Sequence, residues 1–224
     1  MVGTRSIKVF IALVVLAETV FAQTGQSTSP KPLTYGLVLD NSSSLLTELP
    51  KVKEIAKLTV SSNTSDDETF IVSLIQKRKT ALLVDVTTDK SVLLAGVNSL
   101  QREVGQTALI DGIYSSADYL LQLKNKIPER RYALVIISDG EDRASNYKPE
   151  KLLALLKQLK CPLFFVGFLY ELDETDGFVQ ESPRVKARNL IEQLTKKTGG
   201  KAFFINKGTD RNKLVDLLTK ALRN

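Results

Sequence analysis

Strand-length runs that are apolar almost throughout most constrain the fold of this chain. Tyr132–Ser138 and Pro162–Leu169 contain hardly any polar side chains, so each predicts a strand that is buried on both of its faces. Segments such as Thr107–Leu123 and Pro149–Leu159 carry apolar residues at helical spacing. Strands that alternate with helices are typical of a parallel sheet covered by helices on both faces. The sequence therefore predicts a doubly wound α/β domain.

The remaining elements extend this alternation. Strands are expected at 34–39, 69–76, 81–86, 132–138, 162–169 and 202–205. Helices are expected at 50–61, 91–100, 107–123, 149–159, 183–198 and 209–222. The connection 77–80 has the length of a hairpin, so one of the two strands that it joins must run antiparallel to its neighbour. We therefore expect a mostly parallel central sheet with one antiparallel edge strand.

Residues 1–22 have the composition of a secretory signal. Arg5 and Lys8 supply positive charge, Val9–Ala17 is apolar, and Val20–Ala22 offers a small-x-small cleavage site. A membrane-spanning helix needs about 20 apolar residues, so this shorter run favours cleavage over a retained anchor. No later stretch of the sequence is long and apolar enough to span a bilayer. We expect a secreted or periplasmic protein with no stable membrane insertion after signal cleavage.

Two further segments follow the predicted signal. Residues 23–32 are polar with Gly and Pro, which is typical of a linker. Residues 33–224 are expected to form one domain, because their number suffices for a single large core.

The composition excludes several kinds of chemistry. The chain has no histidine and a single cysteine, Cys161, which excludes Ser-His-Asp and Cys-His catalysis and the usual zinc sites. One thiol cannot form an internal disulfide, so Cys161 is expected to be a small buried residue at the start of a strand. The sequence also lacks a Gly-x-Ser-x-Gly elbow and a phosphate-binding glycine-rich loop. We expect no catalytic residues and no enzymatic activity.

The basic balance of the chain does not indicate nucleic-acid binding. The formal net charge is +6, but it is spread along the sequence. Lys77–Lys79 and Glu129–Arg131 are short clusters without interleaved aromatic residues, and no nucleic-acid-binding module surrounds them. They are expected to be turn and strand-edge residues.

Side chains with oxygen atoms follow two of the predicted strands and begin one of the predicted helices. They are Asp40, Ser42, Ser44, Thr107 and Asp139. The carboxyl ends of parallel strands meet at one edge of a sheet, where doubly wound domains bind their ligands. Carboxylate and hydroxyl oxygens suit a hard cation such as Mg²⁺. The five side chains are therefore candidate metal ligands.

With these residues the sequence resembles the von Willebrand factor A domain family, whose members carry a metal-ion-dependent adhesion site. The family pattern is Asp-x-Ser-x-Ser after the first strand, a Thr in a Gly-x-Thr segment, and an Asp in a Ser/Thr-Asp-Gly turn. The five residues fill these positions in order. The resemblance covers roughly Leu33–Leu222, and Thr107–Asp111 and Ser138–Asp142 are similar to a bacterial exported branch of the family. It implies a Rossmann-like fold.

The sequence also departs from the family pattern. Ser43 stands where many members have Gly, and Leu45 stands where many have Met, which implies a slightly displaced loop. No acidic pair follows Ser44, so the resemblance does not imply the second metal site of some integrin domains.

The resemblance implies a bound Mg²⁺, or else Mn²⁺ or Ca²⁺. Ser42, Ser44 and Thr107 would ligate it directly, and Asp40 and Asp139 would act largely through bound water. One coordination position would then receive an Asp or Glu carboxylate from a protein or matrix ligand, as in cell adhesion. Two alternatives remain open, namely a metal-assisted hydrolase and a structural or assembly component whose ion only rigidifies the fold.

The same hydroxyls also have a simpler interpretation, because Ser and Thr often cap helices. Ser44 or Thr47 can begin the first helix, and Thr107 is expected to cap the helix that follows it, which is compatible with metal ligation.

Three further expectations concern the surroundings of the candidate site. The acidic loop Glu171–Gly177 should lie at the same edge, where it either selects partners or is a solvated loop without a role. Asp142 and Ser145 are expected to tie the turn after Asp139 to the next helix. In the family the last helix can slide on ligand binding. Here its Leu214, Leu217, Leu218 and Leu222 are instead expected to pack on the sheet.

Overall fold

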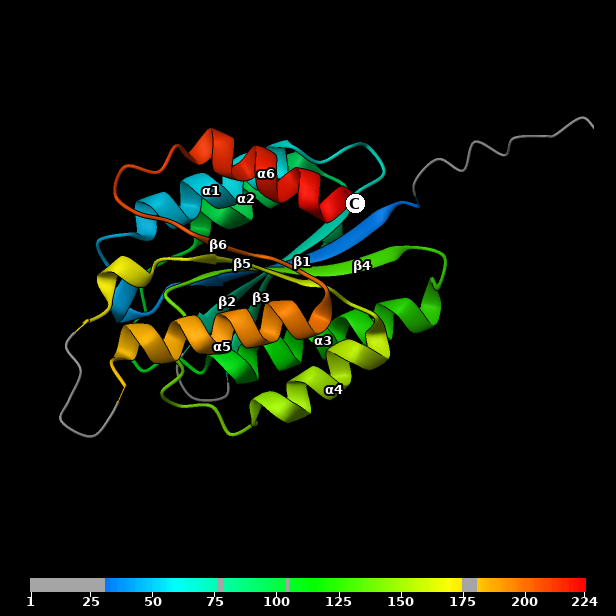
Figure 1. Cartoon of the computed structure of the whole chain (residues 1–224). Helices are drawn as coiled ribbons and strands as arrows, with labels where there is room; N and C mark the ends of the chain where they lie inside the picture. Colours follow the sequence, from blue (N-terminus) through cyan, green and yellow to red (C-terminus); the bar gives the residue numbers. More distant parts are fainter. Residues whose placement is uncertain (1–30, 76–78, 104, 175–180) are drawn as a thin grey trace, which may run out of the picture.

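The computed structural model describes residues 31–75, 79–103, 105–174 and 181–224 (Figure 1). The predicted signal at 1–22 and residues 23–30 of the predicted linker lie outside these ranges. None of the helices within the described ranges has both the length and the apolarity that crossing a membrane requires.

A six-stranded sheet forms the centre of the domain, in the order β3-β2-β1-β4-β5-β6 (Figure 1). Its strands are β1 (Leu33–Asp40), β2 (Glu68–Ile75), β3 (Lys79–Thr87), β4 (Arg131–Ser138), β5 (Leu163–Gly167) and β6 (Ala202–Phe204). Strands β2 and β3 pair antiparallel, and the other described neighbours pair parallel. The predicted sheet with one antiparallel edge strand is confirmed.

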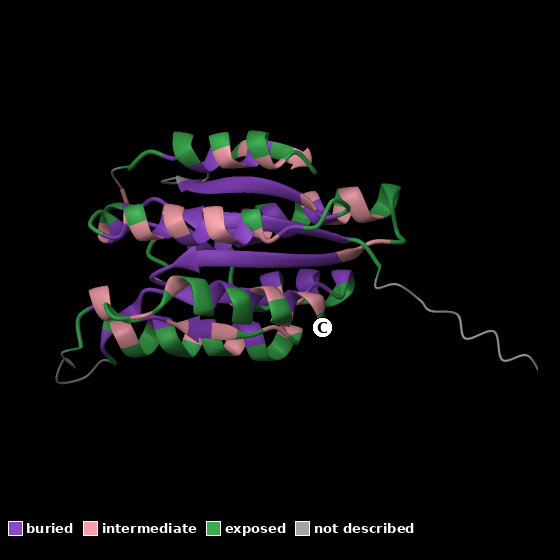
Figure 2. Ribbon diagram, turned by 90° about the horizontal axis from the view of Figure 1, so that it is seen from above, coloured by how far each residue is buried: buried purple, intermediate pink, exposed green. Residues whose placement is uncertain are grey.

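Helices cover both faces of this sheet. On one face lie α1 (Leu49–Ser61), α2 (Lys90–Ser99) and α6 (Arg211–Arg223), and on the other lie α3 (Leu109–Lys126), α4 (Pro149–Leu159) and α5 (Pro183–Thr198) (Figure 1). Because side chains alternate along a strand, Leu37 and Leu39 of β1 enter the first core while Val38 enters the second. Figure 2 shows the strands buried over most of their length and the helices exposed on their outer sides. The predicted doubly wound class is therefore confirmed.

Some element boundaries differ from those expected. Strand β5 ends at Gly167 instead of Leu169, because its neighbours β4 and β6 end at Ser138 and Phe204, and a short 3-10 turn at Leu169–Glu171 follows. Helix α6 begins two residues later than predicted, since Asp210 caps it by accepting hydrogen bonds from the N–H groups of Asn212 and Lys213.

The last helix packs on the sheet as expected, with one correction. Leu214, Leu218 and Leu222 are buried, but Leu217 is 48% exposed. Val215 takes its place in the core, because it lies on the same face of the helix as Leu218 and Leu222.

Cys161 is buried as predicted, and burial raises the pKa of its thiol to about 12.

The connections of β1 and β4 create the point at which ligands bind in sheets of this kind. The two strands are parallel neighbours, with Leu39 of β1 opposite Ile137 of β4. After β1 the chain continues to β2 on one side, whereas after β4 it continues to β5 on the other. The strand order therefore reverses between them, and their carboxyl ends border the expected crevice.

The glycines after α5 allow a test of this packing. Gly199 adopts φ +77° with open space around it, whereas a Cβ on Gly200 would lie 1.9 Å from the backbone oxygen of Leu163. We expect Gly200→Ala to lower the free energy of unfolding by about 2 kcal/mol or more, because β5 would have to shift. Gly199→Asn should change it by less than about 1 kcal/mol, because Asn tolerates this conformation. Urea denaturation of both variants measures the difference, and equal losses would contradict the argument.

Candidate metal centre

The loop after β1 is folded around the carboxylate of Asp40. Its Oδ1 accepts a 2.9 Å hydrogen bond from the backbone N–H of Ser42. The hydroxyl oxygens of Ser42 and Ser44 lie 3.0 Å apart, so the two side chains converge. The side chain of Ser43 points elsewhere and donates to the carbonyl oxygen of Gly105 at 3.2 Å. The loop thus brings together the two hydroxyls that the sequence predicts as ligands and turns the intervening one away.

Asp139 lies next to this loop at the end of β4, and its two carboxylate oxygens differ. Oδ1 accepts a 2.9 Å hydrogen bond from the backbone N–H of Glu141. Oδ2 is buried and has no hydrogen-bond partner among the described residues. The hydroxyl of Ser44 is close enough to lower the pKa of Asp139, but it does not form a hydrogen bond of normal geometry with Oδ2. A buried carboxylate oxygen without a partner is unfavourable unless a cation or water satisfies it.

The two aspartates repel one another in a dry environment. Asp40 and Asp139 are both completely buried. Burial and the neighbouring charge of Asp40 raise the pKa of Asp139 to about 7. Burial also raises the pKa of Asp40, against the opposing effect of hydrogen bonds from Ser138 and Ser42. A cation beside both carboxylates would remove this repulsion, so the residues present fit a divalent ion.

The segment that carries Thr107 is joined to the loops after both strands. Its carbonyl oxygen accepts hydrogen bonds from the N–H groups of Arg143 at 2.9 Å and Ala144 at 3.1 Å. The contact between Ser43 and Gly105 ties the same segment to the loop after β1. The structure therefore gathers the segments that carry all five predicted ligands at one edge of the sheet. Among the described residues no three His, Cys, Asp or Glu side chains cluster for a metal, so a cation held here would also need hydroxyl oxygens as ligands.

The predicted capping roles are wrong. Ala108 precedes α3, and Glu48 precedes α1, and neither helix receives a side-chain hydrogen bond from its N-cap residue. Thr107, Ser44 and Thr47 therefore do not cap these helices. In α1 a proline in the first turn removes one of the N–H groups that a cap would satisfy.

The loop after β4 satisfies the first N–H groups of α3 instead. Ser145 accepts from the N–H of Asp111 at 3.0 Å, and Asp142 makes a long contact of 3.5 Å with the N–H of Ile110. Asp142 and Ser145 thus tie the turn after Asp139 to the preceding helix α3 and not, as predicted, to the next helix α4. The prediction failed because this contact joins residues more than 30 positions apart.

Asp111 and Ser138 support the site and were missed in the sequence. The buried carboxylate of Asp111 accepts hydrogen bonds from Asn146 and from the N–H of Tyr147, at 2.8 to 3.0 Å. Ser138 donates to Oδ2 of Asp40 at 2.6 Å. An acid in the first turn of an apolar helix was the available signal for Asp111. Ser138 is the first residue of the Ser-Asp-Gly turn that resembles the family pattern, but the sequence did not indicate its contact with Asp40.

The acidic loop begins at the expected edge, at the end of the short 3-10 turn that follows β5. Arg184 forms an ion pair with Glu174 and donates to the carbonyl oxygens of Tyr170 and Leu172, so part of the negative charge is compensated. Residues 175–177 of this loop lie outside the described ranges. A role in partner selection remains a prediction.

Known proteins share this fold. The family model of the von Willebrand factor type A domain matches residues 36–218. An aerotolerance-related membrane protein from Bacteroides fragilis superposes with a TM-score of 0.62 at 14% identity, over 85% of this chain and 98% of that chain. A von Willebrand factor type A protein from Catenulispora acidiphila gives 0.61 at 13%, over 88% of this chain and 43% of that one.

A third solved structure of the same fold comes from an animal. Proximal thread matrix protein 1 of the mussel byssus superposes with a TM-score of 0.65 at 17% identity, over 85% of this chain and 48% of that one. The chain thus spans less than half of two of these three structures. No curated protein sequence matches it significantly.

The raised pKa of Asp139 predicts a pH dependence for the protein in chelator. In the folded protein the carboxyl group of Asp139 keeps its proton up to about pH 7. In the unfolded chain an Asp loses its proton near pH 4. The stabilisation from the proton is therefore complete below about pH 4 and lost as pH rises to about 7, by up to about 4 kcal/mol. Asp139→Asn should show a smaller decrease, to which only Asp40, whose pKa burial also raises, still contributes. Urea denaturation with EDTA at several pH values measures it, and identical pH profiles for the two proteins would contradict the assignment.

Proposed function

The chain belongs to the von Willebrand factor type A domain family, and on this basis we propose that it binds a partner protein through a divalent cation held at the ends of β1 and β4. Domains of this family generally mediate interactions between proteins. The partner would be a protein or matrix component that presents an Asp or Glu side chain.

One observation carries the metal dependence of this proposal. Oδ2 of Asp139 is buried without a hydrogen-bond partner among the described residues, beside the buried carboxylate of Asp40 and the converging hydroxyls of Ser42 and Ser44. An arrangement of this kind is unfavourable by itself and becomes favourable around a positive ion. It therefore supports a cation site more strongly than the motif alone.

The roles of the residues follow from their hydrogen bonds. Both oxygens of Asp40 accept hydrogen bonds within the protein, which fixes the position of its charge. Asp139 is anchored by one oxygen and leaves the other for the ion or its bound water. Ser42, Ser44 and Thr107 would add neutral ligands. A bound Mg²⁺, Mn²⁺ or Ca²⁺ would supply the positive charge that attracts the carboxylate of the partner.

We propose binding without a chemical reaction. The chain has no histidine, the commonest general base. Hydrogen bonds already occupy both oxygens of the Asp40 carboxylate. Asp139 is completely buried, which disfavours direct contact with a substrate. These features support a docking site and not a hydrolase.

We also propose that the protein is exported. The support is the signal-like composition of residues 1–22, with its charged start, apolar run and small-x-small end. Cleavage after Ala22 would leave a domain whose metal edge meets its partner in the periplasm or outside the cell.

The loop after β1 supplies its own matched control for the metal site. We expect Mg²⁺ and Mn²⁺ to bind the purified protein saturably and Ser42→Ala to weaken binding about tenfold or more. Ser43→Ala should have little effect, because that hydroxyl contacts Gly105. Isothermal titration calorimetry measures all three proteins. Equal affinities in the two variants, or no binding to the wild type, would refute the proposed centre.

The same titration separates docking from a purely structural ion. A short peptide with one Asp side chain should bind in Mg²⁺ and not in EDTA, because its carboxylate completes the coordination of the ion. A peptide without the acid is the control. If the ion binds but the Asp peptide binds no better than the control, the ion is structural and the docking role is wrong. If the wild-type protein hydrolyses esters and Asp139→Ala abolishes this activity, the alternative of a metal-assisted hydrolase is favoured instead.

A further inference from the structure

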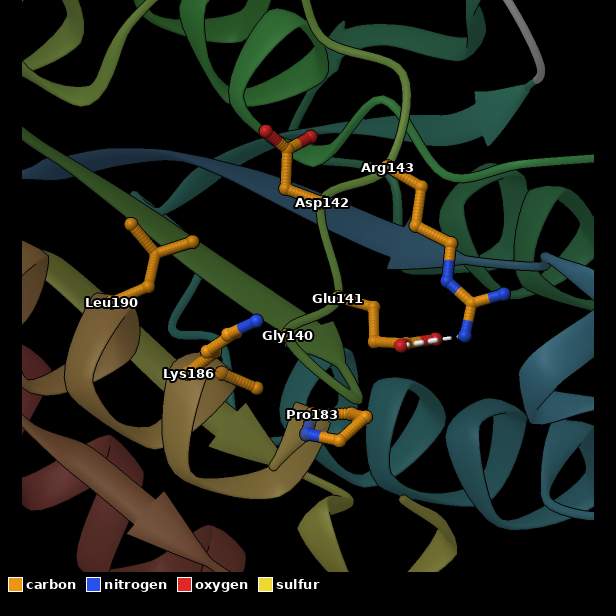
Figure 3. A pocket seen from close by; sticks show the side chains of 8 residues that line it. Gly140, Glu141, Asp142, Arg143, Pro183, Lys186 and Leu190 are labelled. Atoms are coloured by element: carbon orange, nitrogen blue, oxygen red, sulfur yellow. Dashed lines mark hydrogen bonds and ion pairs between the residues drawn. The ribbon is translucent and has the colours of Figure 1, made fainter. Parts of the chain in front are cut away.

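A pocket lies against the turn that directly follows Asp139 of the candidate metal centre, and Figure 3 shows the residues that line it. Its volume is 330 Å³. One wall is the segment Gly140–Arg143, which follows Asp139, and the other wall is the first half of α5. The residues that α5 contributes are Pro183, Lys186, Ala187 and Leu190. The turn that carries a predicted ligand thus also forms one side of this pocket.

The wall formed by α5 is largely apolar. Ala187 is buried, and Leu190 is partly buried and packs against the core under this helix. Gly140 adopts φ +83°, and a Cβ at this position would lie 2.6 Å from a side-chain carbon of Ile191. The turn therefore lies closely on the helix, and the two walls are held at a fixed separation.

The charges on the other wall are already paired. Arg143 and Glu141 form a 2.6 Å ion pair within this wall (Figure 3). The carboxylate of Asp142 is turned away from α5 (Figure 3). It accepts a hydrogen bond from Ser145. Lys186 adds a positive charge at the rim. An apolar group can therefore enter this pocket without burying an unpaired carboxylate.

The volume limits what the pocket can hold. Sites for small molecules and cofactors usually have volumes of about 300–1,000 Å³, so this pocket lies at the lower end of the range. An aliphatic or aromatic side chain suits it better than a cofactor.

We propose that this pocket receives an apolar side chain of the partner, located two residues from the carboxylate that the metal centre binds. The inference rests on the proposed function. Gly140 lines the pocket and follows Asp139 directly, so the Cα atoms of a pocket residue and of a predicted ligand are only about 3.8 Å apart. In an extended segment, side chains two residues apart point to the same side and are separated by about 7 Å. The partner would present an acidic and an apolar side chain in this spacing.

Capped five-residue peptides test the proposal on the full chain. One peptide has the sequence Gly-Asp-Gly-Leu-Gly, a second has Asp and Leu exchanged, and in two controls Ser replaces Leu. We expect one of the Leu peptides to bind about tenfold more tightly than its Ser control in Mg²⁺. NMR titration measures these affinities, and the amide signal of Ala187 should shift with the Leu peptide only, whereas that of Gly140, next to Asp139, should shift with both peptides.

Two variants of α5 test whether the pocket causes the preference for the Leu peptide. Leu190→Ser should remove the preference for Leu without changing the affinity for the Ser peptide. Val185→Ser is the matched control, because Val185 is a 39% exposed apolar residue of the same helix that does not line the pocket. A preference that survives in Leu190→Ser would overturn the proposal. The comparison of peptides in the wild-type chain is decisive even if Leu190→Ser does not fold.

The outcomes distinguish failure of the pocket from failure of the metal centre. Equal affinity for Leu and Ser peptides, with binding lost in EDTA, would overturn the pocket and leave the proposed function intact. A preference for Leu that persists in EDTA would support the pocket and refute the metal-dependent docking. If none of the peptides binds, both proposals are wrong.

Discussion

The burial of two carboxylates at the ends of adjacent strands is the constraint on which the rest of this structure depends. Asp40 and Asp139 are completely removed from solvent, and like charges in such a place repel strongly. The chain compensates locally by directing the N–H groups of Ser42 and Glu141 at these carboxylates. The compensation is incomplete, since it leaves Oδ2 of Asp139 without a partner among the described residues. A local loss of stability of this kind is typical of functional sites.

The sheet explains why this pair can exist. Strands β1 and β4 are parallel and in register, so their ends arrive at the same level. Apolar side chains bury both strands from each face, which prevents either end from moving toward water. The contacts of Asp111 with Asn146 and Tyr147 then hold the loop after β4 against α3. The position of Asp139 is thus set by packing on two sides of the sheet.

Local patterns sufficed to predict the fold because its elements follow simple periodicities. The apolar run that ends at Asp40 indicated a central strand, and the rule for parallel sheets placed Asp139 at the same edge. The capping role of Thr107 was predicted wrongly for a physical reason. The first N–H groups of α3 are satisfied by Asp142 and Ser145 from a distant loop, and no local pattern records a contact across more than 30 residues. The partners of Asp111 were beyond prediction for the same reason, since they lie about as far away in the sequence.

The pocket was also beyond sequence reasoning, because it exists only where a turn and a helix from different parts of the chain meet. One wall of the pocket is nevertheless formed by the same turn that holds Asp139. Gly140 must approach Ala187 and Ile191 closely, and this approach fixes both the carboxylate at the edge and the wall of the pocket. A displacement of the turn would therefore change the two together. Recognition of an acid and of its apolar neighbour would then be coupled, because one rigid segment contributes to both contacts.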